Sequence, residues 1–328
     1  MLENESMKKP LTYDELCALK VARPMRDTFG PNTHQPYLAF YLGGLETSLS
    51  DWLKDLPCPV IGIGKGVLAQ HCDAVLETDK VLSRLIRNIE NAPLASMVLV
   101  QHLRMSDTLK ITDKLTAESL AYSTVQNGPE FQYWLSTYKS KPLPKLDTPS
   151  LKLKTHSDSI SITLSRPDTR NAIDVDMRDA ICEALDFALA DNSFSKIFMT
   201  GEGATFSTGG AVEEFGHVSD PTTAHWIRSL RLPAWRLARL KSKLHIHVNG
   251  AAIGAGVEMA AFGHYVSASS KAWFQLPELK YGLIPGAGGT ASLAERIGRQ
   301  KTAYMALSME KISAQKALKW GLIDAIID

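Results

Sequence analysis

Cysteine is scarce in this 328-residue sequence, which contains four and no CxxC pair. They are spread along the chain as Cys17, Cys58, Cys72 and Cys182. Disulfide frameworks and zinc sites need paired or clustered ligands, so we expect reduced thiols and no metal site. The sequence also has no run of roughly 18 apolar residues that could cross a membrane. Its first residues, MLENESMKKP, contain no apolar signal segment. These absences predict a soluble, cytoplasmic protein that binds no membrane.

A large excess of charge of one sign is missing as well. The net charge is +1, so no strong overall field attracts nucleic acid or an acidic surface. We therefore expect no nucleic-acid partner, and an anionic ligand needs a local basic pocket. The composition, 45% hydrophobic and 22% charged, is that of an ordinary globular protein. The length allows a sizeable core and favours two domains.

The clearest change in composition lies at residues 139–154, KSKPLPKLDTPSLKLK, with three prolines and five lysines. Proline removes backbone donors and favours extended neighbours, so this stretch is typical of a linker. The sequence predicts an N-terminal accessory domain at 1–138, a linker at 139–154 and a second domain at 155–328.

The first part of the N-terminal domain carries strand signals. Short apolar runs predict buried strands at 37–44, 57–64 and 72–78. The glycines of GIGKG at 62–66 match neither the dinucleotide-binding nor the phosphate-loop pattern, so they favour a strand end over a phosphate site.

The rest of this domain carries helix signals. Apolar residues recur at helical spacing over 78–105, interrupted at Pro93, and over 115–138. Thr116 and Ser119 form an imperfect capping-box pattern, which predicts a helix start at that point. We expect a smaller N-terminal domain that is α/β or mostly helical.

Residues 155–328 alternate strand and helix patterns, which argues for a layered α/β domain. The expected order is strand, helix, strand, broken helix and strand, at 157–167, 175–191, 196–203, 225–243 and 244–250. The break falls at Pro233, and the arginines of that helical stretch favour a solvated face over a phosphate-binding role.

Three glycine-rich segments stand out in this half: 204–216, 249–260 and 274–289. Glycine-rich turns between strand and helix leave backbone N–H groups uncovered, and two that converge make an oxyanion hole. Glu258 lies among small and apolar residues, where burying an unused carboxylate is costly, and Glu278 follows Pro277. Two glutamates with apolar neighbours supply a general acid and a general base near neutral pH.

Other polar residues near these segments have simpler interpretations. We expect Glu213 and Glu214 to be solvated residues in the first turn of a helix, and contact with substrate is the alternative. His245 and His247 share one face of a predicted strand but have no third ligand at useful spacing. They therefore favour packing over metal binding.

The ordered motifs SRPDTRNAIDVDM, GEGATFSTGG, NGAAIGAGVEMA and LPELKYGLIPGAGGTASLAERIG resemble the crotonase (enoyl-CoA hydratase/isomerase) superfamily. They resemble its opening strand–turn–helix, its two oxyanion turns and its closing segment, which ISAQKALKWGLID continues. The resemblance covers residues from about 158 to 328. It implies an α/β fold of the crotonase type, a spiral of ββα units.

The resemblance also implies an activity, hydration of a 2-enoyl-CoA to a 3-hydroxyacyl-CoA. The backbone N–H groups of Gly210 and Ala255 hold the enolate-like oxygen, Glu258 activates water, and Glu278 protonates the α-carbon. No metal or redox cofactor is implied, since coenzyme A is part of the substrate. Isomerisation, hydrolysis of a thioester or β-diketone, and a non-catalytic acyl-CoA-binding subunit are the alternatives.

Coenzyme A is expected near the turn that follows the first strand, by the same resemblance. Its binding residues are then Arg166, Arg170, Asn171, Ala172 and Thr208. A homo-oligomer, a trimer or hexamer, is the implied assembly.

Two features depart from the family's pattern. Ala211 stands where the family usually has Asp, and the sequence ends at Asp328, where the family continues into a helical region that covers the acyl pocket. We hypothesise that the N-terminal domain takes over this covering role. Its aromatic segment GPEFQYWL, 128–135, predicts a packed helix, with a lid over the acyl chain as the alternative.

Overall fold

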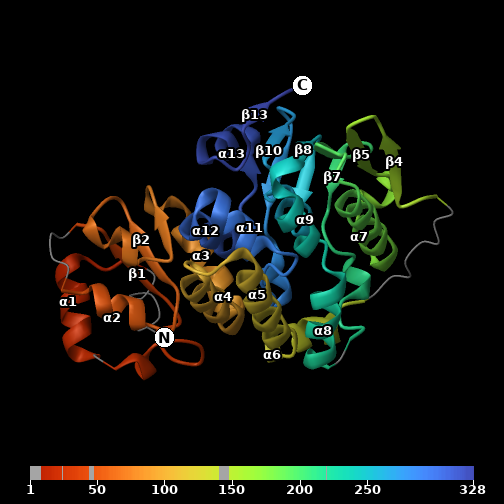
Figure 1. Ribbon diagram of the computed structural model, residues 1–328. Helices are drawn as coiled ribbons and strands as arrows, with labels where there is room; N and C mark the ends of the chain where they lie inside the picture. The colour runs from red at the N-terminus through yellow and green to blue at the C-terminus, as the bar shows by residue number, and fades with distance from the viewer. Residues whose placement is uncertain (1–8, 24, 44–47, 140–147, 219) are drawn as a thin grey trace.

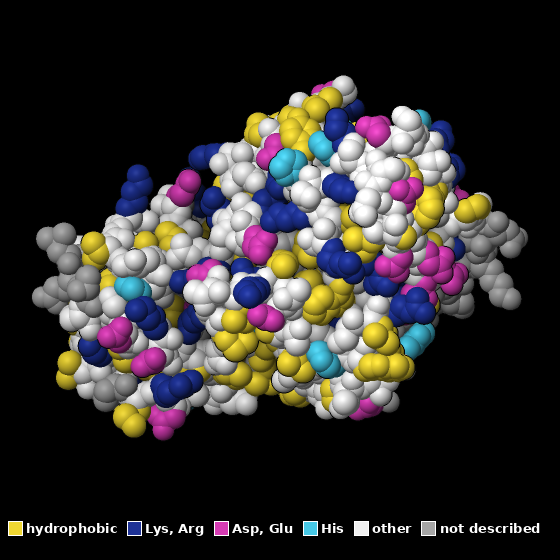
Figure 2. Space-filling view, viewed as in Figure 1, with side chains coloured by type: hydrophobic (Ala, Val, Ile, Leu, Met, Phe, Trp, Pro, Cys, Tyr) yellow, Lys and Arg dark blue, Asp and Glu magenta, His cyan; other side chains and the backbone are white. Residues whose placement is uncertain are grey.

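The computed structural model describes residues 9–23, 25–43, 48–139, 148–218 and 220–328. The fold is α/β with mixed sheets: a three-stranded, a six-stranded and a four-stranded sheet, as far as these residues show. Figure 1 places the small sheet at one end of the molecule, with helices between it and the two larger sheets. Acidic and basic side chains are interspersed over the face in Figure 2, as expected for a net charge near zero.

The small sheet contains the three strands predicted near the N-terminus. They are β1 (Leu38–Tyr41), β2 (Val60–Ile63) and β3 (Ala74–Leu76), parallel and in that order. Helices α1 (Tyr13–Ala22) and α2 (Ser50–Asp55) accompany them. A separate core, which includes Leu16, Phe40 and Leu53, holds this unit together.

Four helices follow: α3 (Leu82–Asn91), α4 (Pro93–Ser106), α5 (Ile111–Gln126) and α6 (Pro129–Thr137). The predicted interruption at Pro93 is confirmed, because this proline occupies the first turn of α4, where its missing N–H costs nothing. The predicted helix start near Thr116 is wrong. Helix α5 begins at Ile111, and the Thr116 hydroxyl donates back to the carbonyl of Thr112, one turn earlier.

The six-stranded sheet has the order β13-β10-β8-β6-β5-β4. Its strands are β4 (Leu151–Thr155), β5 (Ser159–Leu164), β6 (Lys196–Gly201), β8 (Leu244–Val248), β10 (Tyr265–Ala268) and β13 (Ala325–Ile326). The predicted strands over 157–167, 196–203 and 244–250 are confirmed. Residues 151–154 of the expected linker lie in β4, which pairs antiparallel with β5, whereas 140–147 fall outside the described residues.

The four-stranded sheet, order β12-β11-β9-β7, carries the glycine-rich turns. Its strands are β7 (Thr205–Ser207), β9 (Ala251–Ile253), β11 (Trp273–Gln275) and β12 (Ile312–Ser313). The helices of this half are α7 (Val175–Ala190), α8 (Pro221–Arg231), α9 (Ala234–Leu240), α10 (Ala255–Ala260), α11 (Gly289–Ile297), α12 (Arg299–Ser308) and α13 (Ala314–Trp320). The break at Pro233 is confirmed, because it separates α8 from α9.

Helices α3–α6 share one hydrophobic core with the C-terminal half. Leu99 and Phe131 belong to the same buried cluster as Leu283 and Met305. Helix α12 packs on β3, α3 and α4, and α11 packs on α5. This arrangement brings α5 and α6 to the glycine-rich turns. None of the helices in the described ranges is long and apolar enough to cross a membrane.

Candidate active site

The first glycine-rich turn leaves strand β7 and is held by a serine. Ser207 Oγ donates to the carbonyl of Asn171 (2.8 Å) and accepts from the N–H of Gly209 (3.0 Å). Gly209 has φ +83°, and a Cβ there would lie 2.6 Å from the carbonyl oxygen of Ile253 in the second turn. Only glycine permits this backbone approach. The next N–H, that of Gly210, finds no acceptor among the described residues.

The second turn joins β9 to α10 through Gly254, which has φ +51°. The N–H of Gly254 donates to Gln275 across the sheet (2.9 Å). Ala255 opens α10, so its N–H has no acceptor inside the helix. The structure thus places the N–H groups of Gly210 and Ala255 on two abutting turns, as an oxyanion hole requires.

Both turns face one cavity of about 150 Å³. The predicted residues Gly210, Ala255, Glu258 and Glu278 all line it. Side chains that the sequence did not assign to the site complete its wall: Tyr122, Phe215, Arg228, Tyr281 and Leu283.

Glu258 is almost fully buried, with 2% of its surface exposed. Its Oε2 accepts hydrogen bonds from the N–H groups of Ala287 (2.7 Å) and Gly289 (2.8 Å), at the start of α11. Burial raises the pKa of Glu258 well above its usual range, and the charges of Glu278 and Glu118 raise it further. Two backbone donors partly offset that effect, because they favour the ionised form.

Glu278 begins a short 3-10 helix, Glu278–Tyr281. Its Oε2 is buried and has no hydrogen-bond partner in the part of the chain that the structure describes. An unsatisfied buried oxygen on a cavity wall is rare in proteins and points to a ligand. Burial raises the pKa of Glu278 to about 8. The position of this carboxyl depends on Gly254, since a Cβ there would lie 2.8 Å from Oε1.

Glu118 on α5 is a third buried carboxylate beside the site. Its Oε1 accepts from the N–H of Gly288 (2.6 Å), and its Oε2 from the N–H (2.8 Å) and hydroxyl (2.6 Å) of Thr290. Burial raises the pKa of Glu118 to about 7, although these bonds oppose the rise. Sequence reasoning missed this residue. Its signal was an acidic position on the same helical face as the buried Leu115.

Helix α5 also contributes Tyr122, which packs against the turn before α11. A Cβ at Gly286 would lie 2.0 Å from Tyr122 Cδ2. Helix α6 contributes Trp134, whose ring lies 5.0 Å from that of Tyr281 and 6.2 Å from that of Phe215. The aromatic segment at 128–135 therefore packs against two residues of the cavity wall.

Arg228 on α8 lines the cavity, so its side chain does not lie on the solvated face expected for the arginines of 225–243. Its Nη1 donates to Ser123 (2.9 Å) and its Nη2 to Gln126 (2.6 Å), both on α5. Its guanidinium carbon lies 4.0 Å from the centre of the Tyr122 ring.

Only some of the residues predicted to bind coenzyme A line a pocket. Arg166 and Asn171 are buried, and they build the turn. Arg166 pairs with Asp174 (2.7 Å), and the Asn171 side chain bonds three backbone groups. Arg170 and Thr208 line a surface pocket of about 570 Å³. Ala172 lines neither this pocket nor the cavity.

The surface pocket is basic. Lys271, Lys311 and Trp273 stand in it together with Arg170, and Lys311 Nζ lies 4.3 Å from the Trp273 ring centre. Thr208 lines both this pocket and the cavity, so the two hollows adjoin at the first turn.

The histidines of β8 have packing partners. The His245 ring packs at a tilt against the rings of Phe198 and Tyr265, and His247 Nδ1 lies 3.0 Å from Ser267 Oγ. Within the described ranges, no three His, Cys, Asp or Glu side chains are grouped to hold a metal ion.

Comparison with known proteins identifies the C-terminal half. Residues 155–328, more than half of the chain, match the family model described as enoyl-CoA hydratase/isomerase. The 2,3-dehydroadipyl-CoA hydratase of Escherichia coli K12 is 35% identical over 166 residues, which cover 50% of this chain and 64% of that protein. A mitochondrial enoyl-CoA hydratase of Pongo abelii is 34% identical over 166 residues, 50% of this chain and 56% of the relative. The chain thus spans less than two thirds of either relative.

Solved structures agree with this result. An enoyl-CoA hydratase from Thermoplasma volcanium superposes with a TM-score of 0.50 at 30% identity, over 55% of this chain and 73% of that one. A protein from Thermobifida fusca, solved in complex with acetoacetyl-CoA, gives a TM-score of 0.50 at 25% identity, over 54% and 73%.

Proposed function

The chain belongs to the enoyl-CoA hydratase/isomerase family, and from this premise we propose that it adds water across the 2,3 double bond of an enoyl-CoA thioester. The observation that carries the proposal is the convergence of two carboxylates and two uncovered N–H groups on one cavity. Relatives named as hydratases, and a structural neighbour that holds acetoacetyl-CoA, support a CoA thioester as the substrate.

In this mechanism the thioester oxygen accepts hydrogen bonds from the N–H groups of Gly210 and Ala255. One such donor, placed where negative charge develops, contributes about 3–4 kcal/mol to transition-state stabilisation. The charge in question is that of the enolate formed when water attacks the β-carbon. Neither N–H group bonds to an acceptor within the described ranges, so both donors are free for the thioester oxygen and the site is preorganised.

The two carboxyls divide the acid and base roles. Burial raises the pKa of both, so the pair retains a proton near neutral pH. Oε2 of Glu258 accepts two backbone N–H bonds, whereas Oε2 of Glu278 has none from the described residues. Hydrogen bonding therefore favours the negative charge on Glu258 and the proton on Glu278.

The proton steps then balance. Glu258 takes a proton from water as the water oxygen bonds to the β-carbon, and the electron pair of the double bond moves toward the thioester oxygen. Glu278 gives its proton to the α-carbon as the carbonyl re-forms. Return of the proton from Glu258 to Glu278 restores the starting state.

The basic surface pocket beside the first turn is where we propose that coenzyme A phosphates bind. Arg170, Lys271 and Lys311 supply positive charge there. Arg166 is not part of this proposal, because its guanidinium already pairs with Asp174. The trimer or hexamer suggested by family resemblance stays a prediction.

Helices α5 and α6 support the hypothesis that the N-terminal domain covers the acyl pocket. Tyr122 lines the cavity, and Trp134 packs on two of its aromatic walls. Deleting this region would remove part of the shared core, so single substitutions at the contact are the appropriate test.

The test of the proposed function is a product assay. The purified protein is incubated with a panel of enoyl-CoA thioesters in water labelled with deuterium and oxygen-18, and the products are analysed by mass spectrometry. Hydration adds one labelled water, with its oxygen on the β-carbon. Deuterium uptake without added oxygen would instead establish isomerisation, and free coenzyme A would establish hydrolysis. Binding without any reaction would leave the acyl-CoA-binding subunit as the function.

A further inference from the structure

Arg228 is held in a fixed position by one neighbouring helix. Ser123 and Gln126 accept hydrogen bonds from its two terminal nitrogens, and the ring of Tyr122 lies beneath its guanidinium. All three residues are on α5. Tyr122 also shares a side-chain hydrogen bond with Arg228. A guanidinium carries five N–H donors, so about two remain after these three bonds.

None of these partners carries a negative charge. Across the described parts of the chain, no carboxylate oxygen comes within 4.0 Å of the Arg228 nitrogens. By contrast, the well-shielded Arg104 and Arg166 pair with Asp73 and Asp174. Arg228 is partly buried and, unlike Arg104 and Arg166, has no counter-ion among the described residues, which is costly for a shielded cation.

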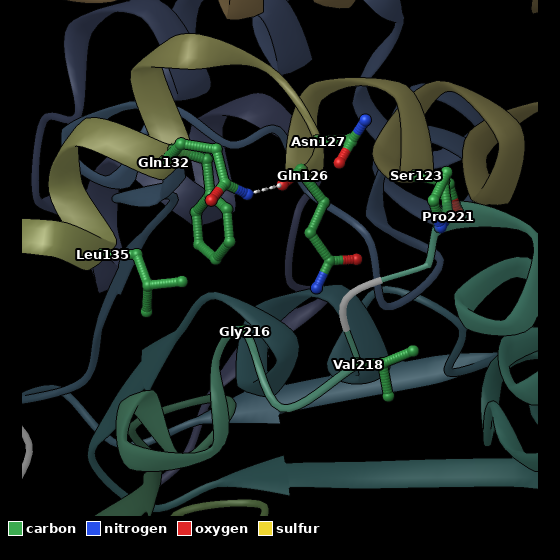
Figure 3. A pocket seen from close by; sticks show the side chains of 9 residues that line it. Ser123, Gln126, Asn127, Gln132, Leu135, Gly216, Val218 and Pro221 are labelled. Carbon is green, nitrogen blue, oxygen red and sulfur yellow. Dashed lines mark hydrogen bonds between the residues drawn. The ribbon is translucent and has the colours of Figure 1, made fainter.

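The residues that accept from Arg228 also border a second pocket whose described lining contains no acid. Ser123 and Gln126 line a second pocket, of about 170 Å³, between α5, α6 and the segment that precedes α8 (Figure 3). Its other lining residues are amide, aromatic, aliphatic or glycine: Asn127, Phe131, Gln132, Leu135, Gly216, Val218 and Pro221. Glu118 attracts Arg228, but only from beyond ion-pair distance.

Arg228 shares the active-site cavity with Gly210, Ala255 and Glu258. These residues line a single small cavity of about 150 Å³, so a group that fills it contacts both the turns and Arg228. A thioester seated on the two turns therefore extends its acyl group into the cavity that Arg228 lines. The cavity wall also includes the side chains of Phe215, Tyr281 and Leu283.

We propose that Arg228 binds a carboxylate at the far end of a short acyl group. The substrate class is then the CoA thioester of a short unsaturated dicarboxylic acid. The planar guanidinium matches a carboxylate through two parallel hydrogen bonds, and its contacts with α5 fix the orientation in advance. This inference rests on the proposed function, because it places the thioester at the oxyanion turns.

The test compares two saturated thioesters that cannot be hydrated, glutaryl-CoA and butyryl-CoA. In glutaryl-CoA a carboxylate replaces one hydrogen of the terminal methyl group of butyryl-CoA. Isothermal titration of the full chain should give at least about tenfold tighter binding of glutaryl-CoA, since removing one partner of a buried charge pair costs at least that much. This comparison of the wild-type protein needs no variant. Equal affinity, or a preference for butyryl-CoA, overturns the inference.

Variants then assign the preference to Arg228. Arg228→Met should weaken glutaryl-CoA binding about 10- to 100-fold and leave butyryl-CoA binding within about threefold. Arg228→Lys, which keeps the charge but not the paired donors, should fall in between. Arg231→Met, at the exposed end of the same helix, is the matched control and should change neither affinity.

Two outcomes separate this inference from the proposed function. If Arg228→Met weakens both thioesters equally, Arg228 only balances the charge of Glu118, and the inference fails while the function stands. If the wild-type protein binds neither thioester, both fail. Glutaconyl-CoA and crotonyl-CoA are the unsaturated counterparts of these two thioesters. Their initial rates with wild type and Arg228→Met test whether the same preference holds for substrates that react.

Discussion

Glu118 and Glu258 bind alternating N–H groups of a single turn. Glu258 accepts from Ala287 and Gly289, and Glu118 accepts from Gly288 and Thr290. The first carboxylate comes from α10 and the second from α5, on opposite sides of the start of α11. These N–H groups have no acceptors within the helix, so the two glutamates together cap α11. The geometry of Glu258 consequently depends on a residue of the N-terminal region.

Glu118 should act as a positioning residue. We expect activity in the order wild type, Glu118→Gln, Glu118→Ala, with about a tenfold loss of kcat for the glutamine variant, because small displacements of a catalytic group are costly. Removing the charge of Glu118 should also lower the pKa of Glu258, since that charge raises it. The acid limb of the kcat/KM profile should therefore move to lower pH. A fall in Tm with an unmoved acid limb would leave only a structural role.

Each of the two glutamates that we propose as catalytic should be essential for turnover. Glu258→Gln and Glu278→Gln should each lower kcat by about 10³-fold or more, near the upper range for general acid–base groups. Binding of butyryl-CoA should stay within about threefold, because neither change alters the volume of the cavity. Glu183→Gln, an exposed change on α7, is the matched control. Rates near wild type in either variant would remove that carboxylate from the mechanism.

Stability should depend on pH through Glu278. Its pKa is raised by burial from 4.5 to about 8 in the folded protein. The folded state therefore binds more protons between these values, and the stabilising effect of the proton is present at low pH and lost as pH rises toward 8. Glu278→Gln has no proton to lose, so its Tm relative to wild type should be higher at pH 8.5 than at pH 5. A difference in Tm that is the same at both pH values would contradict the raised pKa.

The contact of α5 with the turn before α11 can be tested by adding a methyl group. Gly286→Ala should destabilise the protein by about 1–3 kcal/mol, the usual cost of overpacking, because the new Cβ meets the Tyr122 ring. In a Tyr122→Ala background the same change should cost much less. Unfolding in urea of the four proteins measures the coupling, and simple additivity would mean that the two residues do not meet.

The glycine-rich turns and their glutamates were predictable because their signals are local. Gly209 and Gly254 adopt positive φ angles that favour glycine, and Glu258 follows only a few residues after its turn. The order of strands and helices in the C-terminal half is similarly encoded in short apolar patterns, which the structure confirms from β5 to β8.

Glu118, Tyr122 and Arg228 were not predictable in this way. The only mark of Glu118 in the sequence is its place on the helical face of Leu115, because its partners lie at the start of another helix and only packing brings them together. Arg228 was assigned to solvent since charged residues on a basic helix usually face water, but α5 covers it. For Arg166 the error was the reverse: the sequence assigned it to a ligand. Its neighbours Asp174 and Asp176 lie within ion-pair distance, so a predicted ligand-binding charge is already used.

The bond between Glu118 and Thr290 joins residues 172 positions apart in the chain. Loops of this length close late, after local helices and turns have formed. During synthesis α5 leaves the ribosome long before the turn that it caps, so an incomplete chain cannot contain a finished site. We therefore expect enzymatic activity to be among the last properties to return on refolding, after the far-ultraviolet circular dichroism signal has recovered.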